Sequence, residues 1–528
     1  MSRAGTHTHL PPLIRGLLDA RAYPHPVTVP IGLAETHVSW VLLTGEFAYK
    51  LKKPLRLDFL DYSTAELRRR CCEEEVRLNR RHAPGMYLGV AAIGGSTDRP
   101  RVDAAGPPIE HAVRMRQFDA SDELVALIEA GAAAEAELRG LGGAIGELHA
   151  QAGVAGQDSE FGSPAAVRRV TRDNFAALGR LPANVRVECG LESLAIRVEA
   201  ELERRRQLME SRRAGGRVRE CHGDLHCGNV VRWGGRLVPF DGIEFDDALR
   251  WIDVANDVAF LTMDLAERGH AGLARAALQG WLDRLGDFEA LALLPCYEAC
   301  RALVRAKVAA LRVLLASPGA APREAYAQTV GYLAWARQRL EPRSPLLVLT
   351  CGLSGSGKTW LADRVAREHG LLQVRSDVER KRLAGLGPLE DSRSPADGGI
   401  YTLEFNERTY ARLLECARSA IDGGSSLVVD AAFLRARERL AFLTVARGLG
   451  ARAVVLHCHA PLAVLRERVG ARRAAGHDAS EADVALLERQ QGYWEPLTDA
   501  ERPATLDVDT SDDESVERAL ASLPRARG

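Results

Sequence analysis

Residues 346–360 read LLVLTCGLSGSGKTW. The first six form an apolar run of strand length, and the next eight match the pattern GxxxxGK(S/T) of a phosphate-binding loop, which a helix-forming stretch follows. Glycines let successive backbone N–H groups turn toward phosphate oxygens, and the helix dipole adds a favourable field. We therefore predict that this loop binds ATP, through Gly352, Ser354, Gly355, Ser356, Gly357, Lys358 and Thr359.

Two residues of the loop have further predicted roles. Lys358 can reach the β- and γ-phosphates and counts among the catalytic groups, while the Thr359 hydroxyl can ligate Mg²⁺. Beyond the loop, apolar runs at 371–374, 426–430 and 453–458 alternate with helical stretches. Short apolar strands separated by helices are typical of a parallel sheet covered on both faces. We therefore predict an α/β P-loop NTPase domain over residues 344–528.

Charged residues follow the predicted strands in the order that a small-molecule kinase requires. Asp377 comes after the second strand, Asp430 ends the third, and four arginines lie between residues 466 and 473, after the fourth. A kinase needs a carboxylate near the acceptor hydroxyl and cations that close over the transferred phosphate. A structural interpretation is also open, since Asp377 could cap a helix and the arginines could form a solvated face. The order behind the loop favours the functional interpretation.

This part of the chain resembles the P-loop kinase group that includes zeta toxins and polynucleotide 5′-kinases. The resemblance covers most of residues 346–500 and is carried by the segments SDVERKRLAG, VVDAAFL and DASEADVALLERQ. It implies that Asp377 is the base for the acceptor hydroxyl and that Arg380 binds the substrate or a phosphate. It also implies that Asp430 lies near the metal ion and that Arg472 acts in a lid.

A proline-rich break, Glu341-Pro-Arg-Ser-Pro345, precedes the loop and its strand. Two prolines in five residues, followed by a change of hydrophobic period, indicate a domain boundary near residue 343. Residues 1–343 begin with strand-like runs at 37–44 and 46–53, continue into a charged helix, and then become mainly helical. Strands first and helices afterwards predict an α+β bilobal fold of the protein-kinase type.

A second group of residues with phosphotransferase spacing lies at 221–245, which read CHGDLHCGNVVRWGGRLVPFDGIEF. The spacing HxDxxxxN matches the catalytic loop of protein kinases. Asp224 would accept the hydroxyl proton, and Asn229 and Asp241 would hold Mg²⁺ on the ATP phosphates. Zinc binding by the cysteines and histidines of residues 221–227 is the alternative, but ligands adjacent in sequence do not match structural zinc spacings.

This region resembles the aminoglycoside phosphotransferases and their choline-kinase-like relatives, through HGDLHxxN and the DxxxF segment behind it. The resemblance extends over about residues 35–320. It implies that Lys50, in the first hairpin, faces ATP and pairs with Glu75 of the charged helix. One-residue slips are easy in both runs, which leaves competing candidates: Lys52, Lys53, Glu73 and Glu74. The whole chain resembles fusions of such a domain with a P-loop ATP-binding domain.

Length, charge and hydropathy limit the class of protein. A chain of 528 residues is too long for one ordinary core, and 46% hydrophobic with 27% charged residues is typical of a globular protein. The net charge of -1 gives no bulk attraction for nucleic acid. No apolar run reaches the roughly 18 residues of a membrane helix, and the amino terminus lacks a signal-peptide core. We expect a cytoplasmic protein with no membrane partner.

These features together predict a bifunctional kinase that uses ATP and Mg²⁺ and phosphorylates hydroxyl groups of small-molecule acceptors. Two alternatives are open for the C-terminal domain. It could be an ATP-driven switch that regulates the N-terminal domain, or a kinase for polynucleotide 5′ ends or a nucleotide sugar. The near-neutral charge weakens the polynucleotide alternative. The sequence does not identify the acceptor of either domain.

Overall fold

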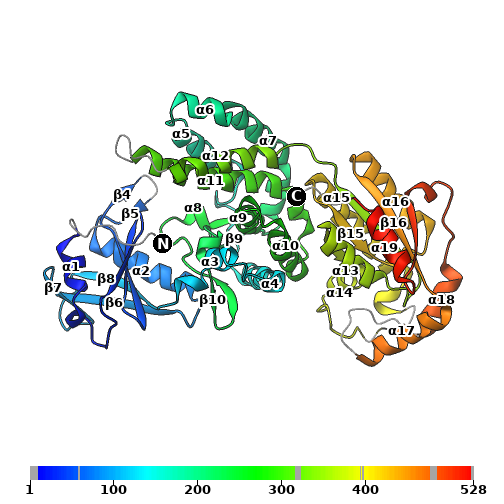
Figure 1. Ribbon diagram of the computed structural model, residues 1–528, viewed down its shortest axis with the longest axis horizontal. Coiled ribbons are helices and arrows are strands. Elements are labelled where there is room, and N and C mark those ends of the chain that lie inside the picture. The colour runs from blue at the N-terminus through cyan, green and yellow to red at the C-terminus, as the bar shows by residue number, and fades with distance from the viewer. Residues whose placement is uncertain are drawn as a thin grey trace. The chain divides into compact units, whose positions relative to one another are not determined.

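The computed structural model describes residues 10–57, 60–315, 323–392, 394, 398–475 and 484–524. The chain forms two compact units (Figure 1). Unit 1 runs to Ala183 and continues over Glu199–Gly280, and unit 2 comprises Asn184–Val198 and the chain from Trp281 onward. Each unit has its own sheet and its own candidate site.

Unit 1 begins with a six-stranded antiparallel sheet in the order β1-β2-β3-β8-β6-β7. Its strands are β1 (Gly32–Glu35), β2 (Ser39–Leu43), β3 (Phe47–Lys52), β6 (Tyr87–Ser96), β7 (Arg99–Val102) and β8 (Glu110–Arg116). Helix α2 (Ala65–Asn79) packs on β6 and β8, because its apolar side chains, such as Cys72 and Val76, share a core with Val113 and Met115 of β8. A charged helix thus lies against the strand next to β3.

The rest of unit 1 consists mainly of helices with three short strand pairs. The pairs are β4 (Arg56–Leu57) with β5 (Leu60–Asp61), β9 (Val218–Glu220) with β12 (Trp251–Asp253), and β10 (Val230–Trp233) with β11 (Arg236–Pro239). The helices up to residue 285 are α1 (Pro12–Leu17), α3 (Leu124–Glu129), α4 (Glu135–Gln151), α5 (Pro164–Leu178), α6 (Ala183–Cys189), α7 (Leu191–Ala214), α8 (Asp247–Arg250), α9 (Val254–Glu267) and α10 (Ala271–Leu285). Of these, α6 after its first residue, the beginning of α7 and the end of α10 belong to unit 2.

Unit 2 contains a five-stranded sheet in the order β14-β15-β13-β16-β17, in which every neighbouring pair is parallel. The predicted parallel sheet is confirmed, but its last strand, β17, was not among the four strands that the sequence predicted. The strands are β13 (Leu346–Cys351), β14 (Leu372–Arg375), β15 (Leu427–Asp430), β16 (Arg452–His459) and β17 (Thr505–Asp509). The helices are α11 (Leu294–Leu315), α12 (Arg323–Arg339), α13 (Lys358–His369), α14 (Ser376–Leu383), α15 (Leu403–Asp422), α16 (Ala436–Gly448), α17 (Leu462–Ala475), α18 (Val484–Tyr493) and α19 (Asp513–Ser522).

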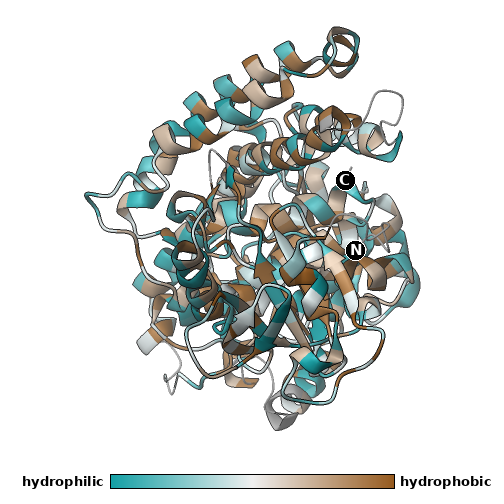
Figure 2. Ribbon diagram, turned by 90° about the vertical axis from the view of Figure 1, so that its left-hand side faces the viewer, coloured by the Kyte–Doolittle hydropathy of each residue, from teal (hydrophilic) through white to brown (hydrophobic). Residues whose placement is uncertain are grey.

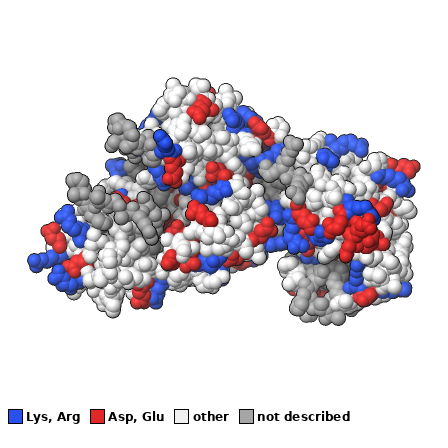
Figure 3. Space-filling model, viewed as in Figure 1, with Lys and Arg blue, Asp and Glu red and all other residues white. Residues whose placement is uncertain are grey.

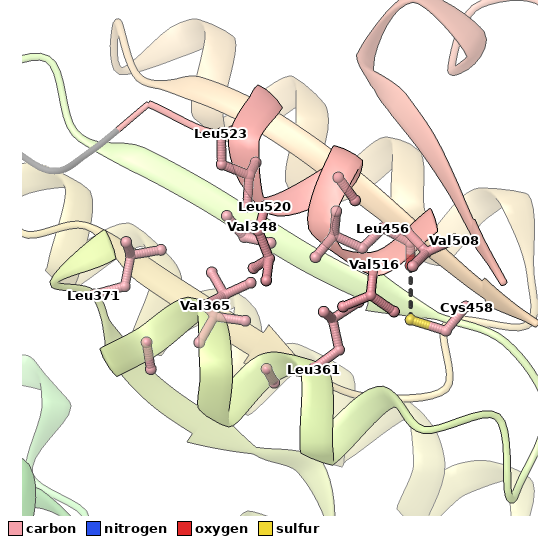
Figure 4. Packing of buried hydrophobic residues seen from close by; sticks show 14 of the residues in the cluster. Val348, Leu361, Val365, Leu371, Leu456, Cys458, Val508, Val516, Leu520 and Leu523 are labelled. Carbon is pink, nitrogen blue, oxygen red and sulfur yellow. Dashed lines mark hydrogen bonds between the residues drawn. The ribbon is translucent and has the colours of Figure 1, made fainter. Parts of the chain in front are cut away.

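Helices α13 and α19 cover this sheet with apolar side chains (Figure 4). Val348 of β13 and Leu456 of β16 lie in one core with Val365 of α13 and Leu520 of α19. Each of these side chains is 3% exposed or less, as expected for a strand run that is apolar on both faces. This packing fixes the end of β13 from which the phosphate-binding loop leaves.

The break that we expect to divide the domains near residue 343 lies inside unit 2, where the chain enters the parallel sheet. Residues before the break already pack against the helices around that sheet. The guanidinium of Arg412 donates to the carbonyl oxygen of Gly286 at 2.6 Å, and Arg382 donates to that of Asp283 at 2.6 Å. The proline-rich break therefore marks the point where the chain passes from helices to the parallel sheet. The boundary of the compact unit lies earlier in the chain, because it depends on contacts between segments that are distant in sequence.

The surface is mixed in character. Polar and apolar residues alternate along the helices (Figure 2), as expected when each helix buries one face. Acidic side chains gather over α19, where Asp512, Asp513, Glu514 and Glu517 are exposed (Figure 3). Among the described residues, no helix combines the length and the apolar character needed to cross a membrane.

Candidate active sites

Two lysines of β3 share one glutamate of α2 in unit 1. Lys50 and Lys52 are two residues apart in a strand and so point to the same face. The Lys50 Nζ lies 3.0 Å from Oε1 of Glu75, and the Lys52 Nζ lies 2.7 Å from Oε2. Lys50 also pairs with Asp241, and Lys52 with Glu244. Burial alone would raise the pKa of Glu75, but the two lysines outweigh it and lower that pKa to about 2.

The competing candidates from the sequence form ion pairs elsewhere. Lys53 lies 2.6 Å from Glu35, and Glu73 and Glu74 pair with arginines of their own helix. Lys52 is the exception, because it occupies the second oxygen of the glutamate that Lys50 contacts. Among the three neighbouring glutamates of the helix, Glu75 is the one that pairs with Lys50, and the strand contributes a second lysine, Lys52, to the same carboxylate.

The loop after β9 brings the predicted base and a predicted metal ligand together. The amide nitrogen of Asn229 donates to the backbone oxygen of Asp224 at 2.9 Å and to its Oδ2 at 3.0 Å. The His226 Nε2 lies 3.4 Å from the same carboxylate oxygen. The Asp224 side chain is 36% exposed, and a substrate hydroxyl could reach it. The amide group of Asn229 thus orients Asp224 through its nitrogen and keeps its oxygen for another ligand.

Two buried carboxylates of α9 hold this loop in place. Asp257 accepts hydrogen bonds from the backbone N–H groups of His222 (3.1 Å) and Gly223 (2.8 Å). Asp264 accepts one from the N–H of Cys227 at 3.0 Å. The sequence analysis assigned neither residue to the site. Their spacing of seven residues, which puts both on one face of a helix, was the available signal.

The backbone turns sharply at Asp241, whose φ is 62°. This left-handed conformation is uncommon outside glycine, and two hydrogen bonds stabilise it. The Asp241 N–H donates to the Tyr87 hydroxyl (3.0 Å), and the Gly242 N–H donates to Oδ1 of Asn79 (2.9 Å). The carboxylate of Asp241 and the amide oxygen of Asn229 are both oxygen donors, which is the ligand type that Mg²⁺ prefers. The donor set fits that ion.

The phosphate-binding loop in unit 2 requires glycine at its bends. Gly352, Gly355 and Gly357 have φ values of 138°, 81° and 78°. A Cβ atom on Gly352 would lie 2.2 Å from the carbonyl oxygen of Cys458, and one on Gly355 would lie 2.6 Å from that of Leu465. Glycine is therefore needed here for two reasons: it adopts the positive φ values of the loop, and it has no side chain that would collide with the neighbouring segments.

The loop opens onto a cavity of about 670 Å³, which gathers most of the predicted residues of unit 2. Its wall includes Lys358, Thr359, Asp377, Arg380 and Asp430. The two strands that deliver the carboxylates are neighbours, since β14 pairs with β15. Ser354 also lines the cavity, and its N–H donates to Oε1 of Gln490 on α18 at 2.8 Å. Residues from both ends of the domain thus meet at the carboxyl edge of the sheet.

Asp430 is 5% exposed, and burial raises its pKa to about 6, although the guanidinium of Arg375, 3.6 Å away, opposes this shift. A side-chain hydrogen bond with Thr359 also favours the charged form. The carboxylate and the threonine hydroxyl again supply oxygen ligands, and this pair fits Mg²⁺.

The predicted lid arginine, Arg472, belongs to α17, but its side chain lies outside the described residues. Arg468, one helical turn earlier, lines the cavity. Its guanidinium donates to Oγ1 of Thr510 at 2.8 Å and to the Thr510 carbonyl oxygen at 3.0 Å. The sequence analysis placed Arg468 in the basic run without a role, and it did not consider Arg375 or Arg435, which also line the cavity.

Comparisons with known proteins place both halves of the chain in context. The model of an AAA domain family, AAA_33, matches residues 347–497. Among solved structures, a sugar kinase from Janibacter sp. HTCC2649 is 25% identical, with a TM-score of 0.26 over 34% of this chain and 94% of that chain. A choline/ethanolamine kinase family protein from Mesorhizobium loti is 14% identical, with a TM-score of 0.38 over 60% of this chain and 90% of that chain.

The uncharacterized protein Rv2004c of Mycobacterium tuberculosis is similar to this chain over both units. It is 31% identical over 479 residues, which cover 90% of this chain and 94% of the relative. An alignment of this length includes residues of both units. The chain therefore belongs to the same family as Rv2004c of Mycobacterium tuberculosis.

Proposed function

We propose that this protein is an ATP-dependent phosphotransferase with two nucleotide sites, each of which transfers a γ-phosphoryl group to a hydroxyl of a small-molecule acceptor. One observation carries the proposal. In each unit, segments far apart in the sequence bring a lysine, an accessible carboxylate and oxygen ligands for a metal ion into one site. Phosphoryl transfer requires little more than this positioning and charge neutralisation.

The antiparallel sheet with α2 and the mainly helical remainder of unit 1 support the bilobal kinase-like fold proposed for residues 1–343, of which residues 184–198 and 281–343 belong to unit 2. Asp224 takes the proton from the acceptor hydroxyl as the new oxygen–phosphorus bond forms. The bond from the γ-phosphorus to its bridging oxygen breaks, and ADP leaves. Lys50, held by Glu75, positions the phosphates, and Mg²⁺ on Asn229 and Asp241 would neutralise their charge.

In unit 2, the domain at residues 344–528 performs the same exchange of bonds. Asp377 accepts the hydroxyl proton, and Arg380 binds the acceptor. Lys358 and the loop N–H groups hold the β- and γ-phosphates, while the basic run of α17, including Arg472, covers them. Mg²⁺ on Thr359 and Asp430 would neutralise phosphate charge.

The test is transfer of labelled γ-phosphate from Mg-ATP into a metabolite extract by the wild-type chain, Asp224→Ala and Lys358→Ala. We expect each variant to lose a different labelled product. The loss should be about 10²–10⁴-fold for Asp224→Ala, because a general base acts in the transition state. Equal transfer by the wild type and Asp224→Ala would contradict the assignment of unit 1.

Asp377→Asn separates a kinase from an ATP-driven switch in unit 2. A kinase loses transfer by about 10²–10⁴-fold but keeps its nucleotide affinity, because the carboxylate acts on the acceptor. A switch needs no acceptor base. If Asp377→Asn forms every product at the wild-type rate, and Lys358→Ala only weakens the product that depends on Asp224, unit 2 is a regulator.

A further inference from the structure

Arg380 carries a buried charge that no carboxylate balances. It is 7% exposed, and its guanidinium donates to the carbonyl oxygen of Ile400 (2.8 Å) and to Oδ1 of Asn406 (2.6 Å). It also lies over the ring of Tyr401, 5.3 Å from the centroid. None of these partners is an anion, and no carboxylate of the described chain forms an ion pair with Arg380. A buried cation without a counter-ion is costly.

Arg435 is a second such cation on the wall of the same cavity. It is half-buried just before α16, and within the described ranges its guanidinium forms no hydrogen bond or ion pair. Glu438 accepts the backbone N–H of Arg435 at 3.4 Å but forms no ion pair with its guanidinium, and burial raises the pKa of Glu438 although the charge of Arg435 opposes this shift. Because Asp377 lines this cavity too, both arginines share it with the proposed base.

Two other arginines of the cavity, by contrast, form ion pairs with carboxylates of the protein. Arg437 lies 2.9 Å from Glu407, and Arg375 lies 3.6 Å from Asp430. The contrast distinguishes arginines that complete the fold from arginines whose charge is left for a ligand. Planar guanidinium groups match carboxylate and phosphate oxygens, often through two hydrogen bonds.

We propose that the acceptor of unit 2 is an anionic hydroxyl compound, whose phosphate or carboxylate group is bound by Arg380 and Arg435 while its hydroxyl faces Asp377. The inference rests on the proposed kinase function of this unit. The nucleotide phosphates have their own cation in Lys358 and their own backbone donors in the loop. Arg380 and Arg435 therefore select the acceptor by its charge.

The first experiment uses the full chain carrying Asp224→Ala, so that unit 1 is silent. A protein-free metabolite extract is divided on an anion-exchange column at pH 7 into unretained and retained fractions, and each is incubated with γ-labelled Mg-ATP. We expect the labelled product that depends on Lys358 from the retained fraction alone. A product from the unretained fraction would overturn the inference. If neither fraction yields one, the kinase function of unit 2 fails, and the inference falls with it.

A second arm identifies the anionic group. The retained fraction is treated with a phosphatase, which is then removed before labelled ATP is added. Loss of the product shows that the group is a phosphate monoester, and survival of the product shows that it is a carboxylate or a phosphodiester, which a phosphatase does not cleave. Both results agree with the inference, because either group carries the charge that the two arginines bind.

Variants then test the arginines with the acceptor so isolated. Arg435→Gln, chosen because Arg435 is not fully buried, should raise the KM for the acceptor by about 10- to 100-fold and leave the KM for ATP unchanged. Arg418→Gln, on the exposed surface of α15 outside the cavity, is the matched control and should change neither constant. An equal rise in the KM for ATP, or no rise for the acceptor, would overturn the role of Arg435.

Discussion

The two sites balance their positive charges in opposite ways. In unit 1, Lys50 and Lys52 each lie between two carboxylates and are 8% and 2% exposed. In unit 2, the guanidinium groups of Arg380 and Arg435 form no ion pair with a carboxylate among the described residues. A cation already paired within the protein is held in position before any ligand binds. A cation without a partner has its charge completed by the ligand, so the second arrangement favours selection of an anion.

The two loops are also held differently. Carboxylates of α9 hold the loop of unit 1 by accepting from its backbone N–H groups, as Asp257 does for Gly223 (2.8 Å). Glycine conformation holds the loop of unit 2, where Gly352 approaches the strand β16 too closely for any side chain. The first loop therefore depends on carboxylates of a distant helix, and the second depends on glycines of its own sequence that leave room for neighbouring segments.

The largest effect is expected from Glu75→Gln, which removes the charge that Lys50 and Lys52 share. Because both lysines and the glutamate are buried, the free energy of unfolding should fall by about 3–5 kcal/mol. Urea unfolding of the full chain, followed by circular dichroism, measures the change in the transition of unit 1. Glu66→Gln is the control on the same helix. Its partners, Arg69 and Arg70, are at the surface, and it should leave the unfolding free energy nearly unchanged.

Equal effects of the two substitutions would remove the contrast, since the buried lysines would then need no internal counter-ion. Urea unfolding of Asp377→Asn tests the other side of the comparison between the two sites. That variant should unfold like the wild type, because Asp377 takes part in no ion pair with the described residues.

A smaller effect is expected from Gly352→Ala. Its φ of 138° and the 2.2 Å approach to the Cys458 oxygen would force the loop to shift. Strain of about 1–3 kcal/mol should weaken nucleotide affinity by about 10- to 100-fold. Binding of a fluorescent ATP analogue, measured in a Lys50→Ala background so that unit 2 is observed alone, tests this. Gly448→Ala is the control, because a Cβ there meets open space. Unchanged affinity in Gly352→Ala would show that the loop tolerates a side chain.

The smallest effect concerns the pH dependence of unit 1. Burial lowers the pKa of His222 below its ordinary value of 6.5, and its Nε2 is bonded to the carbonyl oxygen of Phe240 at 2.9 Å. Below pH 6.5 the unfolded chain takes up a proton that the folded chain does not, so stability falls as the pH decreases. Between pH 7.5 and 5.5 the loss should reach at most about 1.4 kcal/mol for this group.

Urea unfolding at the two pH values measures that loss. In His222→Gln the difference between them should shrink, though not vanish, because burial also lowers the pKa of His82. The same difference in the variant and the wild type would mean that His222 does not titrate on unfolding.

Much of the second unit could be predicted from local sequence. The pattern of residues 352–359 specifies a backbone path within eight residues, and the apolar runs around it predict four of the five strands. The spacing of Asp224 and Asn229 is local in the same sense, since a loop of six residues brings them into hydrogen-bond contact. Such features depend on conformations that neighbouring residues impose on each other, and a single sequence contains that information.

The partners of those residues were decided by tertiary structure alone. Glu73, Glu74 and Glu75 are equivalent in the sequence, and the packing of α2 on the sheet selects Glu75 by turning it inward. The same holds for Asp257 beneath the first loop and for Arg435 in the second cavity, because each comes from an element whose distance in sequence says nothing of its place in space. Local sequence thus determined the two loops and the parallel sheet, and only the packing of distant elements decided which charges are balanced and which are left for a ligand.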